Sequence, residues 1–137
     1  MSEYLEKAKE LRKGEVEHIN CAQAVLMSYA KRANLSEEQA FQIAQNFGGG
    51  MKRGATCGVV SAGLMVLGLL GKDNPALVRE FYQRLREKHQ GQLECAALLQ
   101  MNKERGGQKK THCDGMVFEA VEILEELLRK ETYSQEL

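Results

Sequence analysis

Helix start and stop signals recur along this chain, whereas the alternating β-branched runs that indicate strands do not occur. Only one of the 137 residues is a proline. We therefore predict an all-α fold, a single compact bundle of about five to seven helices. The length suits one domain with a core of its own, so residues 1–137 are expected to form a single helical four-cysteine domain.

The expected helices are bounded by residues that cap helices and by glycines that end them. They run over residues 3–13, 21–33, 37–47, 57–70, 75–89, 95–100 and 112–130, with the first ended by Gly14. The helix over 57–70 lacks a polar face, so we expect it to be buried at the centre of the bundle. The expected caps are Ser2, Asn20, Ser36, Thr56, Asn74 and Thr111.

Charge and hydropathy argue against two classes of partner. Nineteen basic and 19 acidic residues give a net charge of zero, which does not indicate binding to nucleic acid. The charged N-terminal segment lacks the apolar stretch of a signal peptide. The longest apolar stretch, Val59 to Leu70, is shorter than the roughly 20 residues that span a bilayer. We therefore predict a cytoplasmic protein with no membrane partner.

Four cysteines, each expected at the start of a helix, are the residues best suited to chemistry. The free N–H groups and the dipole of a helix start favour a thiolate. Cytoplasmic thiols are kept reduced, so four of them indicate transient redox or metal chemistry more than a permanent disulfide framework. The candidate catalytic residues, which are also the candidate metal ligands, are Cys21, Cys57, Cys95 and Cys113.

Cys57 is predicted to be the most reactive of the four. It is expected in the first turn of its helix, and the nearby cations of Lys52 and Arg53 would lower its pKa. The absence of a side chain at Gly58 would let a ligand or another cysteine approach. The alternative is that the glycines here serve tight turns and close helix packing.

Cys113 has weaker support as a reactive thiol. His112 adjoins it as a candidate base, but Asp114 disfavours a thiolate. Cys21 and Cys95, each taken alone, are more typical of small core residues.

The glycine-rich segment before Cys57 is a candidate binding site for an anionic group of a cofactor. Its spacing matches G-x4-G, but Ala55 and Thr56 replace the Lys-Ser/Thr pair of a P-loop. An anion at the following helix start would therefore be bound without a nucleotide motif. The candidate cofactor-binding residues are Gly49, Gly50, Gly54 and Gly58.

The spacing of the cysteines matches no common metal motif. They are separated by 36, 38 and 18 residues (57 − 21, 95 − 57 and 113 − 95), without the close pairs of zinc and iron–sulfur sites. A helical bundle can still gather ligands from several helices, so zinc or an iron–sulfur cluster stays a candidate cofactor. No CxxCH occurs, which excludes an ordinary c-type haem attachment.

The ordered combination of these segments resembles a known family. Asn20–Val25, Phe47–Met51 and Gly54–Gly68, followed by the single Cys95 and Cys113, resemble the C_GCAxxG_C_C family of small redox-active proteins. The resemblance covers residues 20–128 and aligns all four cysteines. It implies a redox role for them but no substrate.

That family is also similar to the non-haem part of split-Soret cytochromes, whose haem-binding motif this chain lacks. Where members commonly show Cys-Gly-Ala-x-x-Gly, this chain carries Val59 and Ala62 in place of the alanine and the second glycine. Both residues are larger than those of the family pattern.

Three functions stay open at this point. The leading hypothesis is a redox protein with a shared cysteine site, Cys57 as central thiol and an unidentified redox partner, acting by thiol–disulfide exchange or by electron transfer through a metal centre. The second is a non-catalytic module in which four cysteines bind zinc or another soft metal. The third is a helical interaction domain with structural cysteines. The fourth and last helices could also provide the face of a homodimer.

Overall fold

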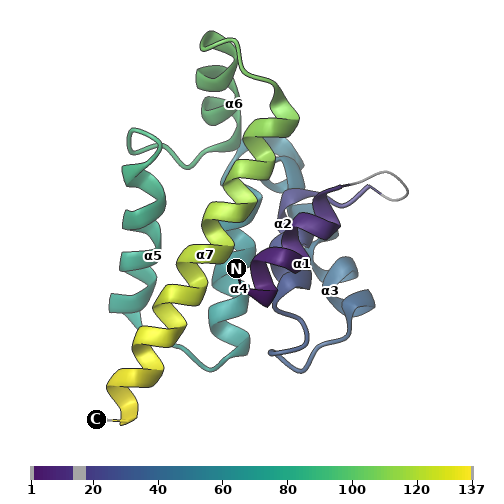
Figure 1. The fold of residues 1–137 in the computed structure, drawn as a ribbon. Coiled ribbons are helices and arrows are strands. Elements are labelled where there is room, and N and C mark those ends of the chain that lie inside the picture. The colour runs from purple at the N-terminus through teal and green to yellow at the C-terminus, as the bar shows by residue number, and fades with distance from the viewer. Residues whose placement is uncertain (1, 14–17, 137) are drawn as a thin grey trace.

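The computed structural model of the chain describes residues 2–13 and 18–136. Seven α-helices form within this part, which confirms the predicted all-α class (Figure 1). The predicted end of the first helix at Gly14 lies outside the described residues. Two short helical turns, η1 and η2, connect α3 to α4. The elements are α1 Glu3–Arg12, α2 Cys21–Ser28, α3 Glu37–Ala44, η1 Gln45–Phe47, η2 Gly50–Gly54, α4 Gly58–Leu69, α5 Pro75–Glu87, α6 Cys95–Glu104 and α7 Lys109–Glu136.

Four of the predicted caps are confirmed. The side chains of Ser2, Asn20, Ser36 and Asn74 each accept a hydrogen bond from a backbone N–H in the first turn of the following helix. At Asn20 and Ser36 the glutamine three residues later bonds back to the cap, which completes a capping box. These helix starts are fixed by neighbouring residues alone.

The two predicted threonine caps are wrong. Thr56 forms an isolated antiparallel bridge with Glu94, and Cys57 takes the N-cap position of α4. The N–H of Cys57 donates to the Leu93 carbonyl at 2.8 Å, so a distant segment holds this stretch extended. At the other site α7 already begins at Lys109, which places Thr111 inside its first turn.

Helix lengths also differ from the prediction, and α7 continues to Glu136 rather than to residue 130. The second helix stops at Ser28 rather than Ala33, and the chain continues in turns up to Asn34, which has a φ of 58°. The sixth continues beyond Gln100, through what was predicted to be a loop, as far as Glu104. It ends where Gly106 adopts a φ of 77°, a conformation that glycine adopts without strain.

The core lies around α2, α4 and α7. Helix α4 is buried along most of its length, as predicted, but α2 is buried as completely, with seven of its eight residues inside. This follows from its neighbours, because α1, α3, α4 and α7 all pack against it. Figure 1 shows the long α7 crossing the whole bundle, with α5 on one side of it and α1 and α2 on the other.

Helix α7 positions the remaining elements. It contacts α1, α2, α4, α5 and α6, so its N-terminal half meets the starts of several other helices. The ring of Phe81 in α5 lies against Gly63 in α4, where a larger residue would collide with it. Within the described residues, no helix has the length and apolar character needed to cross a membrane.

Candidate functional site

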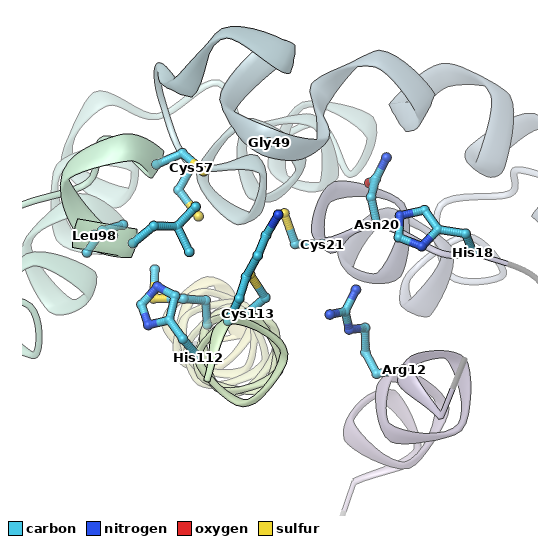
Figure 2. A pocket seen from close by; sticks show the side chains of 13 residues that line it. Arg12, His18, Asn20, Cys21, Gly49, Cys57, Leu98, His112 and Cys113 are labelled. Carbon is cyan, nitrogen blue, oxygen red and sulfur yellow. The ribbon is translucent and has the colours of Figure 1, made fainter. Parts of the chain in front are cut away.

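All four cysteines line one cavity of about 130 Å³. Cys21 comes from the first turn of α2, Cys57 from the N-cap of α4, Cys95 from the first turn of α6 and Cys113 from the second turn of α7. Figure 2 shows Cys21, Cys57 and Cys113 around the same space, although they belong to different helices. The other lining residues are Arg12, His18, Asn20, Gly49, Leu98, Leu99, Lys109, His112 and Met116.

Cys21 and Cys57 are in direct contact at this cavity. Cys57 is only 6% exposed, and a hydrogen bond between its thiol and the Cys21 sulfur shifts the pKa of both groups. Gly58 makes the approach possible, because a Cβ at this position would lie 2.7 Å from the Cys21 sulfur and 2.9 Å from the Phe47 carbonyl oxygen. The predicted role of Gly58, to let another cysteine approach, therefore matches the geometry.

The contact separates the pKa values of the two thiols. The hydrogen bond from Cys57 lowers the pKa of Cys21 to about 6, against the opposing effect of burial. The backbone N–H of Gly49, the Arg12 charge and the N–H of Ala22 lower it further. The same hydrogen bond, followed by burial and the Cys21 charge, raises the pKa of Cys57 far above its ordinary value. Cys21 is therefore the thiolate and Cys57 the thiol.

The sequence indicated Cys57 as the more reactive thiol, whereas the directions of the pKa shifts favour Cys21. Cys57 lies at a helix start, but its N–H is already bonded to Leu93, and burial disfavours its charged form. Lys52 and Arg53, the cations expected to activate it, are exposed and do not line the cavity. The cation that lowers the pKa of Cys21 is Arg12, which lies on the cavity wall.

The other two cysteines are thiols in this arrangement. Burial, and then the charge of Cys21, raise the pKa of both Cys95 and Cys113, while Lys109 lowers both. Cys113 lies inside α7 rather than at its start, so the predicted activation by the helix N-terminus is wrong for this residue.

Arg12 is held at the cavity by a set of hydrogen bonds that the sequence did not indicate. Its Nε donates to Asp114 Oδ1 at 2.6 Å, and a terminal nitrogen donates to the Ile19 carbonyl at 2.7 Å. Lys110 Nζ lies 3.0 Å from the other oxygen of Asp114. Asp114, expected to oppose a thiolate at Cys113, is thus engaged by two cations.

A histidine pair adjoins the cavity on the α7 side. His89 Nε2 lies 2.7 Å from Glu119 Oε2, and its ring meets that of His112 edge to face at 6.3 Å between centroids. Burial, and then the charge of His89, lower the pKa of His112, which keeps its ring neutral at pH 7. His89 is thus partly buried and paired.

The four candidate cofactor-binding glycines have separate roles in the structure. Gly49 lines the cavity and its N–H bonds to the Cys21 sulfur. At Gly50 a Cβ would lie 2.8 Å from the Cβ of Cys95, and at Gly54 it would lie 3.0 Å from the Cβ of Ala96. The missing side chains at Gly50 and Gly54 therefore let the glycine turn, residues 48–54, pack closely against α6. The missing side chain at Gly58 lets the start of α4 pack closely against α2.

The described residues do not form a metal-binding group. Three or more ligating side chains must converge on one point, and no set of His, Cys, Asp or Glu in the described part of the chain does so. The four cysteines thus share a cavity wall without the convergence that zinc or an iron–sulfur cluster requires.

The comparisons with known proteins identify the family. Residues 19–127 match the model of a family described as "Putative redox-active protein (C_GCAxxG_C_C)". The chain belongs to this family. The matched range contains all four cysteines of this C_GCAxxG_C_C protein and the glycine turn before Cys57. Val59 and Ala62, where the chain departs from the family pattern, are fully buried and packed in the core. The searches among curated proteins and solved structures gave no match.

Proposed function

We propose that this C_GCAxxG_C_C protein carries out thiol–disulfide exchange, with Cys21 and Cys57 cycling between two thiols and one disulfide. The shared position of the two cysteines carries the proposal, since both line one cavity and the Cys21 sulfur lies against Gly58, the residue next to Cys57. The family description as redox-active supports it independently.

In the first step Cys21 is the nucleophile. It is the thiolate of the pair and is less buried than Cys57, so a disulfide that enters the cavity meets it first. Its sulfur attacks one sulfur of the substrate disulfide. A Cys21–substrate disulfide bond forms, the substrate S–S bond breaks, and the other half of the substrate leaves as a thiolate.

In the second step Cys57 resolves the mixed disulfide. The Cys57 proton passes to the thiolate released in the first step, which becomes a thiol. The Cys57 sulfur then attacks the Cys21 sulfur and releases the second half of the substrate as a thiolate. The products are a Cys21–Cys57 disulfide, one substrate thiol and one substrate thiolate, so two electrons have moved from protein to substrate. A dithiol partner would reduce the pair again by the reverse reaction.

Cys95 and Cys113 complete the same cavity and are proposed as a reserve pair. Because their pKa values are raised, they stay protonated while Cys21 reacts. Their position on the cavity wall would let either one attack a disulfide held at Cys21. Under this proposal a Cys57→Ser variant shows slow secondary resolution rather than none.

Peptide mapping by mass spectrometry tests the proposal. The reduced protein is treated with a small disulfide, its free thiols are alkylated, and the remaining disulfides are assigned. We expect a Cys21–Cys57 disulfide in the intact chain and a trapped mixed disulfide at Cys21 in Cys57→Ser. A first disulfide that joins Cys95 to Cys113, or oxidation that leaves Cys21 reduced, would contradict the proposal.

The same preparation addresses the metal-binding alternative. Protein purified without oxygen is analysed for zinc and iron, and its four thiols are counted with an alkylating reagent. We expect no stoichiometric metal. We also expect all four thiols to react without a chelator, either in the native protein or after unfolding. One bound metal ion per chain, with thiols that react only after chelation, would favour the metal-binding module instead.

A further inference from the structure

A second hollow adjoins the cysteine cavity and gives it a charged approach. This outer hollow has a volume of about 460 Å³. Arg12, His18, Lys109 and Cys113 line both spaces, so the two lie side by side. The outer hollow is completed by Ile19 and Lys110.

The described walls of this approach are basic. Arg12, Lys109 and Lys110 carry three positive charges, and none of the described residues that line the two spaces is acidic. Asp114 engages Arg12 and Lys110 from behind and cancels one charge, which leaves a net charge of two. Among the described residues Lys109 takes part in no ion pair and is exposed.

The inner cavity has a different character. Its walls combine the four cysteines with Leu98, Leu99 and Met116. A volume of about 130 Å³ accommodates a few heavy atoms, such as a disulfide bond and the carbons beside it, but no folded loop of another protein. An apolar sulfur-containing centre would therefore fit inside, while charged ends would remain in the outer hollow.

We propose that the substrate of the exchange reaction is a small disulfide whose arms carry carboxylates. The inference rests on the proposed function of Cys21 and Cys57. The disulfide bond enters the inner cavity toward the Cys21 sulfur, and a carboxylate binds Lys109 and Lys110 in the outer hollow. The positive field also attracts the anion during its approach. As in the exchange reaction, the small disulfide is the oxidant, and it takes up two electrons from the Cys21–Cys57 pair.

Three disulfides that differ only in the charge of their ends test this inference. Dithiodipropionate is anionic, hydroxyethyl disulfide is neutral and cystamine is cationic, and each has two carbons between sulfur and end group. The rate constant for formation of the Cys21–Cys57 disulfide is measured with each of the three compounds. Each rate constant is then divided by the rate constant for the reaction of the same compound with a free small thiol. We expect the anionic compound to be at least about tenfold faster than the cationic one, with a ratio that falls as salt is added.

Charge variants locate the effect. Lys109→Gln is expected to lower the normalised rate with dithiodipropionate by about fivefold more than that with hydroxyethyl disulfide, the size expected for one close ion pair. Lys88→Gln, which removes the same charge from the exposed end of α5, is the control and should change neither rate.

The outcomes separate the two proposals. Equal normalised rates for the three disulfides, or a faster reaction of cystamine, would overturn the inference about the substrate and leave the exchange function intact. An equal loss of rate in Lys109→Gln and Lys88→Gln would also overturn it. If none of the three disulfides oxidises the Cys21–Cys57 pair, the exchange function fails and the substrate inference fails with it.

Discussion

The sulfurs of Cys21 and Cys57 share one proton unequally. The pKa shifts favour Cys57 as the donor and Cys21 as the acceptor, so the charge stays on the less buried of the two cysteines. An arrangement of this kind combines a ready nucleophile with a protected resolving thiol. In the proposed exchange reaction, the second thiol would activate the first before it reacts with the mixed disulfide.

Reactivity at Cys21 should follow this lowered pKa. Because alkylation requires the thiolate, a group with a lowered pKa reacts at a lower pH than an ordinary thiol. We expect the alkylation rate of Cys21 to rise with a midpoint near pH 6, and to stay nearly constant above pH 8. Alkylation by iodoacetamide, followed by mass spectrometry of the Cys21 peptide, measures this profile.

Two substitutions at Cys57 identify the cause. Cys57→Ala removes the hydrogen-bond donor and should move the Cys21 midpoint to higher pH. Cys57→Ser keeps an O–H donor at nearly the same place and should preserve a low midpoint. Identical profiles for the two variants would show that the hydrogen bond does not activate Cys21.

Residue identity and spacing predicted which residues meet at the cavity but not the contacts between them. The four cysteines and Gly58 were all indicated by the sequence, and all of them lie at the cavity or against it. The order of reactivity stays a prediction, because it depends on the interaction between two residues 36 positions apart (57 − 21). Arg12 was missed because only the packing of α1 against α7 brings it to the site.

Helix α4 offers a comparison between two of its own glycines. At Gly58 a Cβ would lie 2.7 Å from the Cys21 sulfur and 2.9 Å from a backbone oxygen, whereas at Gly68 nothing lies within 4 Å. We expect Gly58→Ala to lower the free energy of unfolding by about 1–3 kcal/mol and to slow formation of the Cys21–Cys57 disulfide. Urea unfolding and the oxidation assay measure the two effects.

Gly68→Ala is the matched control, because it makes the same chemical change in the same helix. It should raise the free energy of unfolding by roughly 0.5–1 kcal/mol, since alanine favours the helix, and leave oxidation unchanged. Equal effects of the two substitutions would mean that close contact at Gly58 does not position Cys21.

The contact between α1 and α7 gives a second prediction at the scale of elements. Arg12→Gln removes a partly buried charge that bonds Asp114 and Ile19, so we expect a loss of about 1–3 kcal/mol in the free energy of unfolding. It should also move the Cys21 midpoint to higher pH, because the Arg12 charge lowers that pKa. Urea unfolding and the alkylation profile measure these changes.

Arg129→Gln provides the comparison for Arg12. Arg129 pairs with Glu125 on the exposed side of α7, and its side chain is 70% exposed. Loss of such a pair costs about 0.5 kcal/mol or less and should not alter Cys21. If Arg12→Gln behaves in the same way, the ion pair with Asp114 contributes neither to the fold nor to the site.

At the scale of elements, local signals predicted helix starts better than helix ends. Asn20, Ser36 and Asn74 cap their helices through bonds to residues two or three positions away, which a sequence shows directly. Thr56 failed because its segment pairs with Glu94, and α7 begins earlier than Thr111. Errors of this kind arise where distant parts of the chain decide the local conformation.

For the whole molecule we propose that residues 1–137 unfold as one domain. Helix α2 packs against α1, α3, α4 and α7, and α7 in turn contacts α5 and α6, so no group of helices has a core of its own. A chain built in this way is expected to lose its structure in one cooperative transition. Coincident urea curves from circular dichroism and tyrosine fluorescence would support this, and separate curves would contradict it.

Oxidation should stabilise the whole fold. A Cys21–Cys57 disulfide joins residues 36 positions apart (57 − 21). Closing a loop of this length in the unfolded chain corresponds to about 4 kcal/mol in the chain-entropy model. We expect the oxidised protein to unfold at higher urea concentration than the reduced protein.

Cys57→Ser is the control for this difference. It cannot form this disulfide, so an exposure to the same oxidant that is shorter than the slow resolution by Cys95 or Cys113 should leave its unfolding midpoint nearly unchanged. A wild-type midpoint that does not rise when mass spectrometry shows the Cys21–Cys57 bond would contradict the expected stabilisation.

The cavity walls extend from Arg12 to Met116, which has a consequence for synthesis on the ribosome. Arg12 reaches its place by bonding Asp114, and Asp114 and Cys113 both belong to α7, which follows the other described helices in the sequence. While the nascent chain is still short of α7, we expect Cys21 and Cys57 to emerge without their enclosing wall and to react as ordinary thiols. Selective reactivity is then acquired only after α7 has been made and has docked.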